Sequence, residues 1–468
     1  MMMTEKILIF LVVTVSLCCR AYGQDIWIKN TNVIDVENGQ VKENMDILIK
    51  DGLIFEISDH QTQEKKPDNV EVIDGSGKYL LPGFVDTHVH MAMGEVEVSV
   101  VDGQPTIGMN LEDELPEITA SLLLKHGITT SRDPGGFTEV TVQVKENIAS
   151  GKMMGPELFV AGSILDTTQF TNLVAQVKSK SEVVEEVRKQ KASGVDFIKF
   201  YTSLPPELLE AGIREAHKIE LETIAHLHNT SWTEASRLGI DNIVHIIPVS
   251  DIYIPDEHKA SYHQSVLMGS KAFYKWFEYV DLESEKISEL ISTLKKNNTS
   301  VDPTLVVFHA TFFGNTSAYK THELLSELPD KMIENWQTIF NFNLGWTEQD
   351  FIDAQKIWPK VQRFVKMLHD QGIMLTTGTD TNNPWIIPGG SFHRELQLLT
   401  GCGLTNAEIL KMATLNGAKL LKVEDRIGTI EKGKEADLVL LSSNPLLDIQ
   451  NVKDIAMIIS NGVKVELK

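Results

Sequence analysis

The chain has 468 residues, 42% of them hydrophobic, which is enough for one large barrel with an accessory domain or for two to three average domains. Acidic residues outnumber basic ones 65 to 43, and the formal net charge at pH 7 is −22. Because this charge repels nucleic acid and anionic lipid head groups, the composition argues against both as partners.

The first 23 residues have the pattern of a cleaved export signal. Lys6 precedes an apolar run over residues 7–17, and Ala21-Tyr22-Gly23 offers the small residues that a signal peptidase reads. A run of about 11 residues is too short for a hydrocarbon core that needs about 20. We therefore expect no stable membrane span and a periplasmic or secreted mature protein that begins at Gln24, with a lipoprotein anchor at Cys18 or Cys19 as the minor alternative.

Cleavage after Gly23 leaves Cys402 as the only cysteine of the chain. A single cysteine allows neither an intramolecular disulfide nor a cysteine-based zinc cluster. Any metal ion in the mature protein must therefore be bound by nitrogen and oxygen ligands.

The two ends of the chain share one sequence pattern, in which short apolar segments are separated by turn residues. Residues 24–80 alternate short apolar segments with Asn38-Gly39 and Asp51-Gly52 turns, and residues 428–468 contain similar segments over 436–441 and 455–465. We predict that both ends complete one small β-sandwich domain, and that residues 81–427 form the catalytic domain.

Short apolar strands alternate with helical stretches in the region between these ends. The clearest helices are predicted over 181–192 and 207–218, with Gly194 and Gly239 in helix-ending turns. Eight strands with intervening helices predict an α/β fold with a TIM-like (β/α)8 barrel, whose active site lies at the carboxyl ends of its strands. The predicted strands are 82–88, 127–132, 157–162, 196–201, 222–227, 242–246, 301–307 and 373–379.

His88 and His90 end the first predicted barrel strand. Side chains in a strand repeat every two residues, so both imidazoles project to one face and could share a metal ion. Chance also supplies such a triplet in a chain with 14 histidines, so the other strand ends must decide between the two interpretations.

Polar residues stand at the ends of further predicted strands. Lys199 lies inside an apolar strand, where an ammonium is costly to desolvate and a structural ion pair is the competing interpretation. His226, His228 and His245 follow the next strands, where each alone is more often a hydrogen-bonded interior histidine than a ligand. Asp380 ends the last strand, and a shared metal gives a reason for its burial.

The ordered set of these segments resembles the amidohydrolase superfamily, in particular its imidazolonepropionase-like and Xaa-Pro dipeptidase-like metal hydrolases. The resemblance covers nearly the whole mature chain. Its landmarks are LPGFVDTHVH (81–90), GITTSRD (127–133), FIK (197–199), Ala225-His226, Val244-His245, TGTD (377–380) and the return GTIEKGKEADLV (428–439).

The resemblance implies a site for two divalent metal ions, for which zinc is the best match to imidazole and carboxylate ligands, with manganese, cobalt and iron as the alternatives. His88, His90 and Asp380 would bind the more buried ion, and His226 with His245 the more exposed one. Lys199 would react with carbon dioxide to give N6-carboxylysine, a carbamate that bridges the ions. His228 would contact substrate, or it would replace His226 as ligand, since both face the same side of the strand.

The implied chemistry is amide hydrolysis, in which a hydroxide between the ions attacks a carbonyl carbon and Asp380 passes the proton to the leaving nitrogen. The expected small-molecule substrate is a dipeptide or an N-acyl amino acid. The alternatives are a hydrolase of cyclic amides, lactones or phosphotriesters and, more remotely, a non-catalytic binding protein. Arg132 and His393 are left outside the catalytic set, the latter as part of a helix start.

Two long insertions above the barrel, residues 247–300 and 308–372, are candidates for a lid. Seven aromatic residues in the first insertion have helix-like spacing, which favours packing against the barrel wall over contact with substrate. They are Tyr253, Tyr262, Phe273, Tyr274, Trp276, Phe277 and Tyr279.

Overall fold

The structure is a computed structural model that describes residues 24–60, 69–101, 104–265 and 270–466. The predicted export signal therefore lies outside the described residues. No helix within the described ranges combines the length and apolar character needed to cross a membrane.

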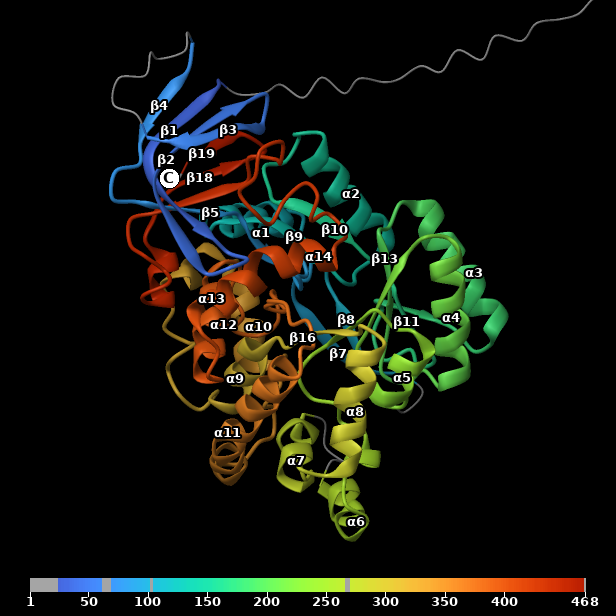
Figure 1. Ribbon diagram of the computed structural model, residues 1–468. Coiled ribbons are helices and arrows are strands. Elements are labelled where there is room, and N and C mark those ends of the chain that lie inside the picture. Colours follow the sequence, from blue (N-terminus) through green and yellow to red (C-terminus); the bar gives the residue numbers. More distant parts are fainter. Residues whose placement is uncertain (1–23, 61–68, 102–103, 266–269, 467–468) are drawn as a thin grey trace, which may run out of the picture.

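Strands from both ends of the chain form one eight-stranded sheet, in which the blue and red strands of Figure 1 lie together. The predicted turn glycines, Gly39 and Gly52, have positive φ angles of 67° and 77°, a conformation that glycine adopts without steric cost. The sheet encloses its own apolar core, which includes Ile28, Ile47 and Ile459. Its strands are β1 (Ile26–Asp35), β2 (Gln40–Lys50), β3 (Leu53–Asp59), β4 (Glu71–Asp74), β5 (Tyr79–Pro82), β17 (Leu438–Leu441), β18 (Ile455–Ser460) and β19 (Val463–Val465).

The central region forms two parallel sheets that follow each other around a ring, with strand orders β10-β9-β6 and β12-β11-β13-β14-β15-β16. The Asp196 amide donates to the Val160 carbonyl at 2.8 Å and so joins β10 to the second sheet. The strands are β6 (Phe84–Asp86), β9 (Ile128–Asp133), β10 (Glu157–Val160), β11 (Ile164–Asp166), β12 (Val174–Gln176), β13 (Phe197–Phe200), β14 (Glu222–Ala225), β15 (Asn242–Val244) and β16 (Ser300–Asp302).

Residues 373–379 fill the gap between β16 and β6. The Val301 amide donates to the Met374 carbonyl at 3.0 Å, and the Thr87 amide donates to the Thr377 carbonyl at 2.9 Å. These hydrogen bonds close the ring, and the predicted barrel with a small domain built from both chain ends is confirmed.

Two of the predicted strands are wrong in detail. The seventh ends at Asp302, because Pro303 lacks an amide donor and Thr304 has a φ of 45°, and the following apolar residues form helix α9. The eighth is not a regular strand: residues 373–379 pair with β16 only through an isolated bridge at Leu375.

The helices cover the ring (Figure 1). The two helices predicted most clearly are observed as α3 and α4, and Gly194 and Gly239 end α3 and α5 with φ angles of 98° and 97°. The helices before the first insertion are α1 (Leu115–Lys125), α2 (Thr138–Ala149), α3 (Lys180–Ser193), α4 (Pro206–Lys218) and α5 (Trp232–Leu238). The helices within the first insertion are α6 (Asp256–Ser265), α7 (Lys271–Tyr279) and α8 (Glu285–Lys296). Those that follow are α9 (Leu305–Phe312), α10 (Asp330–Thr338), α11 (Glu348–Asp370), α12 (Gly390–Gly401), α13 (Asn406–Lys411) and α14 (Gly417–Leu420).

The aromatic residues of the first insertion pack into the main core, as their spacing favoured. Tyr253, Tyr274, Trp276 and Phe277 are at most 1% exposed, and Phe273 is the member of the set that reaches the cavity described below. The second insertion contributes Phe308, Phe340 and Phe342 to the same cavity. The insertions therefore build a wall of the site.

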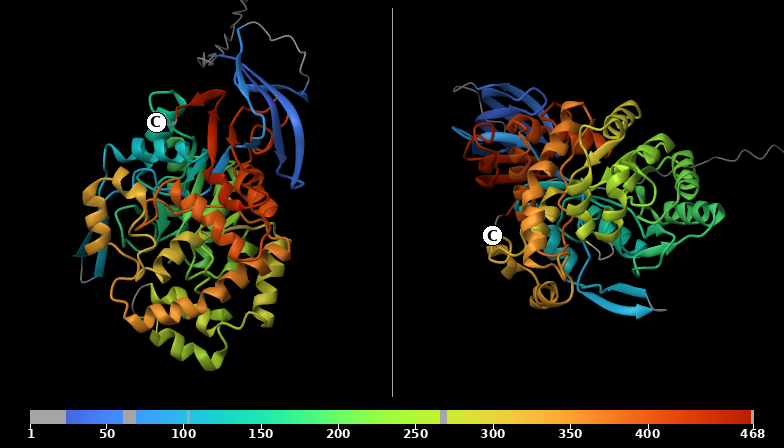
Figure 2. Two further views of the ribbon diagram at one scale, coloured as in Figure 1. Left: turned by 90° about the vertical axis from the view of Figure 1, so that its left-hand side faces the viewer. Right: turned by 90° about the horizontal axis from the view of Figure 1, so that it is seen from below.

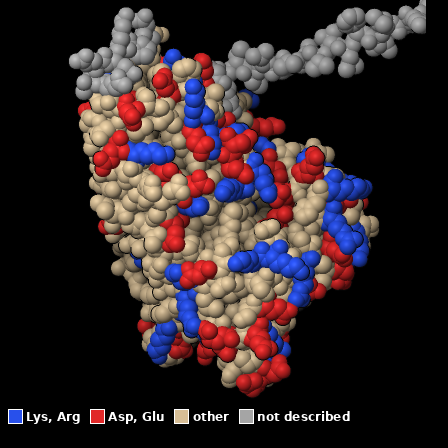
Figure 3. Space-filling view, viewed as in Figure 1, with Lys and Arg blue, Asp and Glu red and all other residues tan. Residues whose placement is uncertain are grey.

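A two-stranded hairpin, β7 (Val96–Val101) and β8 (Gln104–Met109), was not predicted. It projects from the body of the molecule (Figure 2), while Ile107 and Met109 at its base line the cavity. The charged side chains of the face in Figure 3 are of both signs and interspersed, so the acidic excess is not gathered there into one block.

Candidate metal centre

The barrel brings all six predicted ligands to one cavity of ≈ 560 Å³. They come from the carboxyl ends of its strands, where parallel strands present their catalytic residues. His88 and His90 follow β6, His226 follows β14, His245 follows β15, Lys199 lies in β13, and Asp380 follows residues 373–379.

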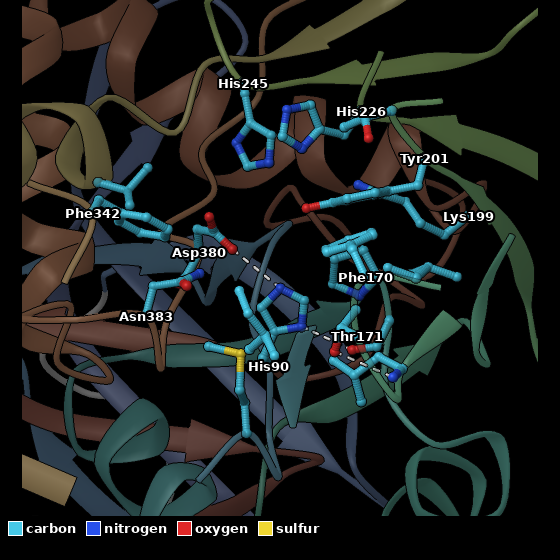
Figure 4. Close-up of a pocket in the computed structure, with 18 of the residues that line it drawn as sticks. His90, Phe170, Thr171, Lys199, Tyr201, His226, His245, Phe342, Asp380 and Asn383 are labelled. Carbon is cyan, nitrogen blue, oxygen red and sulfur yellow. Dashed lines mark hydrogen bonds and ion pairs between the residues drawn. The ribbon is translucent and has the colours of Figure 1, made fainter. Parts of the chain in front are cut away.

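Three of these side chains form a tight group. The Nε2 atoms of His88 and His90 lie 3.2 and 3.1 Å from the same oxygen, Oδ1 of Asp380. A dashed line in Figure 4 marks the contact between His90 and Asp380. Ligand atoms of the three residues all lie within 4.8 Å of one another. This spacing and donor chemistry suit a single divalent cation.

The remaining imidazoles continue from this group. The His245 ring centroid lies 5.1 Å from that of His88 and 4.4 Å from that of His226. His226 and His228 are joined through their Nε2 atoms at 3.1 Å, so both line the cavity, as the shared strand face predicts. His226 Nδ1 is buried with no hydrogen-bond partner among the described residues, which leaves it available as a donor to a metal.

Lys199 is 3% exposed and lines the same cavity as these imidazoles and Tyr201 (Figure 4). Burial and, to a smaller extent, the nearby Arg132 guanidinium lower the pKa of Lys199 to about 7, although the Asp380 and Asp302 carboxylates oppose the shift. None of the described residues makes a hydrogen bond or an ion pair with its Nζ. The structural ion pair considered for this lysine is therefore not observed, and the lowered pKa favours the neutral amine more than in a lysine exposed to water.

Most of the histidines are held neutral. Burial lowers the pKa of His245 to about 3 and of His228 to about 4, and it lowers the pKa of His88 and His226 well below the usual value. Burial would also lower the pKa of His90, but the adjacent Asp380 and Asp133 carboxylates raise it. Neutral imidazoles have a free lone pair, which is the form that binds metal.

Asp86, the last residue of β6, fixes the backbone around the tight group. Its Oδ1 accepts hydrogen bonds from the amides of His88 and Thr379, each at 3.1 Å, and its Oδ2 accepts the Thr379 hydroxyl at 2.8 Å. The Asp380 amide in turn donates to the His88 carbonyl at 2.8 Å. The first strand and the last segment of the ring are thereby locked to each other.

Two candidate ligands have a left-handed backbone, with φ angles of 70° at His245 and 62° at Asp380. Such strained conformations of non-glycine residues concentrate at functional sites, where the surrounding structure holds them. Here His245 is held by a 2.8 Å hydrogen bond between its Nδ1 and the Thr304 hydroxyl.

Sequence reasoning missed several residues of the site. Asp133 ends β9 and lies 3.7 Å from His90 Nδ1. Tyr201 follows Lys199 by two residues, a spacing that places both on one face of a strand and was a usable signal. Its hydroxyl group points toward Asp380 (Figure 4).

Arg132 and His393, which the sequence analysis left outside the catalytic set, are not among the residues that line this cavity. The Arg132 guanidinium is buried, donates to the Thr87 carbonyl at 2.6 Å and to Asn242 Oδ1 at 2.8 Å, and lies 3.7 Å from Asp302. His393 lies in the first turn of α12, with its Nε2 bonded to the His126 carbonyl at 3.0 Å. Both residues support the barrel wall.

Comparisons with known proteins identify the family of the chain. The sequence profile of the Amidohydrolase family matches residues 79–465. A 5'-deoxyadenosine deaminase of Methanobrevibacter smithii is 25% identical over 414 residues, which cover 85% of this chain and 80% of the deaminase. A dihydroorotase of Carboxydothermus hydrogenoformans is 51% identical over 63 residues, which cover only 14% of each chain.

Among solved structures, a Xaa-Pro dipeptidase with methionine bound in its active site superposes with a TM-score of 0.68 at 22% identity, over 94% of this chain and 100% of the dipeptidase. This likeness supports the fold. The family match also confirms the predicted enzyme class, a metal-dependent hydrolase that acts on carbon–nitrogen bonds. The chain belongs to the amidohydrolase family.

Proposed function

We propose that this protein is an exported, binuclear amidohydrolase that cleaves the C–N amide bond of a substrate built like a dipeptide or an N-acyl amino acid. The observation that carries the proposal is the convergence of the His88 and His90 imidazoles on Asp380 in the same cavity as Lys199, His226 and His245. All of these donors are nitrogen or oxygen atoms of the kind that zinc prefers.

The residues fit a metal pair. His88, His90 and Asp380 would hold one ion, and His226 with His245 would hold the other. His226 Nδ1 is buried and has no hydrogen-bond partner among the described residues, which a bound metal ion would supply. When bound, divalent ions supply Lewis acidity toward the carbonyl group and lower the pKa of water.

Lys199 would join the ligand set as a carbamate. Its neutral Nζ forms a bond to the carbon of carbon dioxide and releases a proton, which yields an anion in place of an amine. The anion would be stabilised by adjacent cations, whereas a protonated lysine offers no lone pair.

Asp380 would move the proton. Its Oδ1 faces the two imidazoles of His88 and His90, while none of the described residues forms a hydrogen bond with its Oδ2. Oδ2 would accept the proton of the attacking water and deliver it to the leaving nitrogen, which departs poorly as an anion. His228 would face the substrate from the other side of His226.

The proposal is tested with metal-loaded protein, a screen of dipeptides, N-acyl amino acids, cyclic amides, lactones and phosphotriesters, and two variants. We expect Asp380→Asn to reduce kcat by about 10²-fold or more. Lys199→Met should lose bound metal. It should also lack the added mass of carbon dioxide that mass spectrometry should detect on Lys199 of the native protein. The exposed Lys189→Met is the matched control. Retention of metal and full turnover by both site variants would overturn the proposed chemistry.

Export is a separate part of the proposal and has its own test. Protein expressed in a bacterial host with its native first residues should be recovered from the periplasm or medium, with Gln24 as the amino-terminal residue. Recovery of an uncleaved chain in the cytoplasm would contradict it, and acylation of Cys18 or Cys19 would favour the lipoprotein alternative.

A further inference from the structure

The wall of the cavity beyond the ligand set is strongly apolar. Phe170, Phe273, Phe308, Phe340 and Phe342 contribute aromatic rings, and Met109 of the hairpin adds a flexible thioether. Aromatic and methionine side chains of this kind bury apolar groups and adapt to their shape. A substrate substituent that fills this part of the cavity gains about 25 cal/mol for each Å² of apolar surface removed from water.

The same wall has no cation to receive an anionic substituent. Lys199 is the single Lys or Arg among the described residues that line the cavity, and it belongs to the proposed ligand set. The nearest arginine in the barrel wall, Arg132, is not among the lining residues, and its donors are taken by the Thr87 carbonyl and Asn242.

Several neutral hydrogen-bond donors of the lining are engaged within the protein. The Thr311 hydroxyl donates to the Val307 carbonyl at 2.8 Å, and Asn383 Nδ2 donates to the Asp380 carbonyl at 2.9 Å. The Thr202 hydroxyl faces Asp166 at 3.4 Å. The Tyr201 hydroxyl points toward Asp380 (Figure 4), and the His228 imidazole lies beside His226, so both polar groups face the ligand set.

From this lining we infer that the substrate is an electrically neutral derivative of an N-acyl amino acid, apolar beyond its scissile amide, with its carboxyl group masked as an ester or amide. The inference rests on the proposed function, because the metal ligands would face the scissile bond. A free carboxylate on the far side of that bond would lose its hydration without gaining a lysine or arginine partner among the described lining residues other than Lys199.

The test compares substrates that share one scissile bond. N-acetyl-phenylalanine, its methyl ester and its carboxamide are offered to the metal-loaded full chain, and release of acetate is measured. We expect kcat/KM for the neutral members to exceed that of the free acid by about 100-fold. An equal or larger kcat/KM for the free acid would overturn the inference while leaving the proposed hydrolysis intact.

A failure of the proposed function is distinguishable from a failure of the inference. If none of the amides, lactones or phosphotriesters is hydrolysed, the proposed function is wrong. Calorimetric Kd values for N-acetyl-phenylalanine and its carboxamide then still test whether the cavity prefers a neutral ligand. Tighter binding of the carboxamide supports a neutral ligand, and tighter binding of the acid overturns it.

Phe342 provides a gain-of-function test, since it lines the cavity together with Asp380 and Asn383. Phe342→Arg adds the missing cation and should raise kcat/KM for the free acid about tenfold relative to the carboxamide. Phe342→Met is the matched control, because it keeps an apolar side chain and should keep the preference for the neutral substrate. Equal effects of Phe342→Arg on both substrates would contradict the inference.

Discussion

Gly378 occupies a position where no side chain fits. A β-carbon there would lie 2.3 Å from Oδ2 of Asp302 and 2.6 Å from the β-carbon of His88. Both neighbours belong to the barrel interior and are at most 1% exposed, so neither has space to retreat. The close approach of residues 377–380 to β6, and with it the distance between Asp380 and His88, depends on this glycine.

We predict that Gly378→Ala displaces His88 from Asp380 and weakens metal binding by about 10- to 100-fold, as loss of supporting contacts does in metal sites. Metal content after dialysis and kcat for the reloaded enzyme measure the effect. Gly108→Ala in β8 is the control, because a β-carbon there makes only ordinary contacts at 3.8 Å or more. Undiminished metal affinity in Gly378→Ala would show that the site tolerates the displacement.

At the same scale, the candidate ligand positions were predictable and their support was not. Lys199 lies in an apolar strand, and strand ends on one edge of a barrel meet in space. The other candidates, His88, His90, His226, His245 and Asp380, follow the apolar segments of the barrel. In the sequence, Asp86 looks like any other residue of the strand. Only the fold shows that its carboxylate accepts a hydrogen bond from Thr379, nearly 300 residues away. Long-range contacts of this kind leave no local pattern.

At the scale of elements, the errors have local physical causes. Residues 301–307 look like a strand because they are apolar and β-branched, yet Pro303 and Thr304 end it, and α9 is buried on all sides and so lacks helical periodicity. The β7–β8 hairpin did have a signal. Val96, Val98 and Val100 alternate with polar residues, which is typical of a strand with one apolar face.

Asp437 is a buried titratable residue that connects the start of β17 to the turn between β18 and β19. Asp437 precedes β17, its Oδ1 accepts the Asn461 amide at 2.7 Å, and its Oδ2 is buried without a partner among the described residues. Burial raises the pKa of Asp437 to about 7, and the nearby carboxylates of Glu435 and Glu157 act in the same direction. In the unfolded chain an aspartate titrates near pH 4.

Between about pH 4 and pH 7 the folded protein therefore binds a proton at Asp437 that the unfolded chain has released, so this group makes stability fall as the pH rises. We predict that Asp437→Asn, which is neutral throughout, removes this part of the decline. The difference in Tm between the variant and the native protein should become more favourable to the variant from pH 5 to pH 8. A difference that stays constant with pH would contradict the assignment.

At the scale of the whole molecule, the sequence was sufficient for the architecture because two levels of pattern agree. The central region alternates strands and helices, while both ends carry hairpin-like segments with Asn-Gly and Asp-Gly turns. What it could not supply is the shape of the cavity wall. Phe170, Phe273 and Phe342 come from three separate loops and helices, and only the folded chain brings their rings together.

The composite sheet also fixes the order in which the protein can be completed during synthesis. β5 pairs with β1 from the amino-terminal side and with β17 from the carboxyl-terminal side, and β17 begins only at Leu438. While the ribosome makes the barrel, one edge of β5 has no partner, and exposed strand edges invite pairing with other chains. A nascent chain stalled or truncated before Leu438 is thus left with an open, adhesive edge, whereas the finished chain closes it with its own last strands.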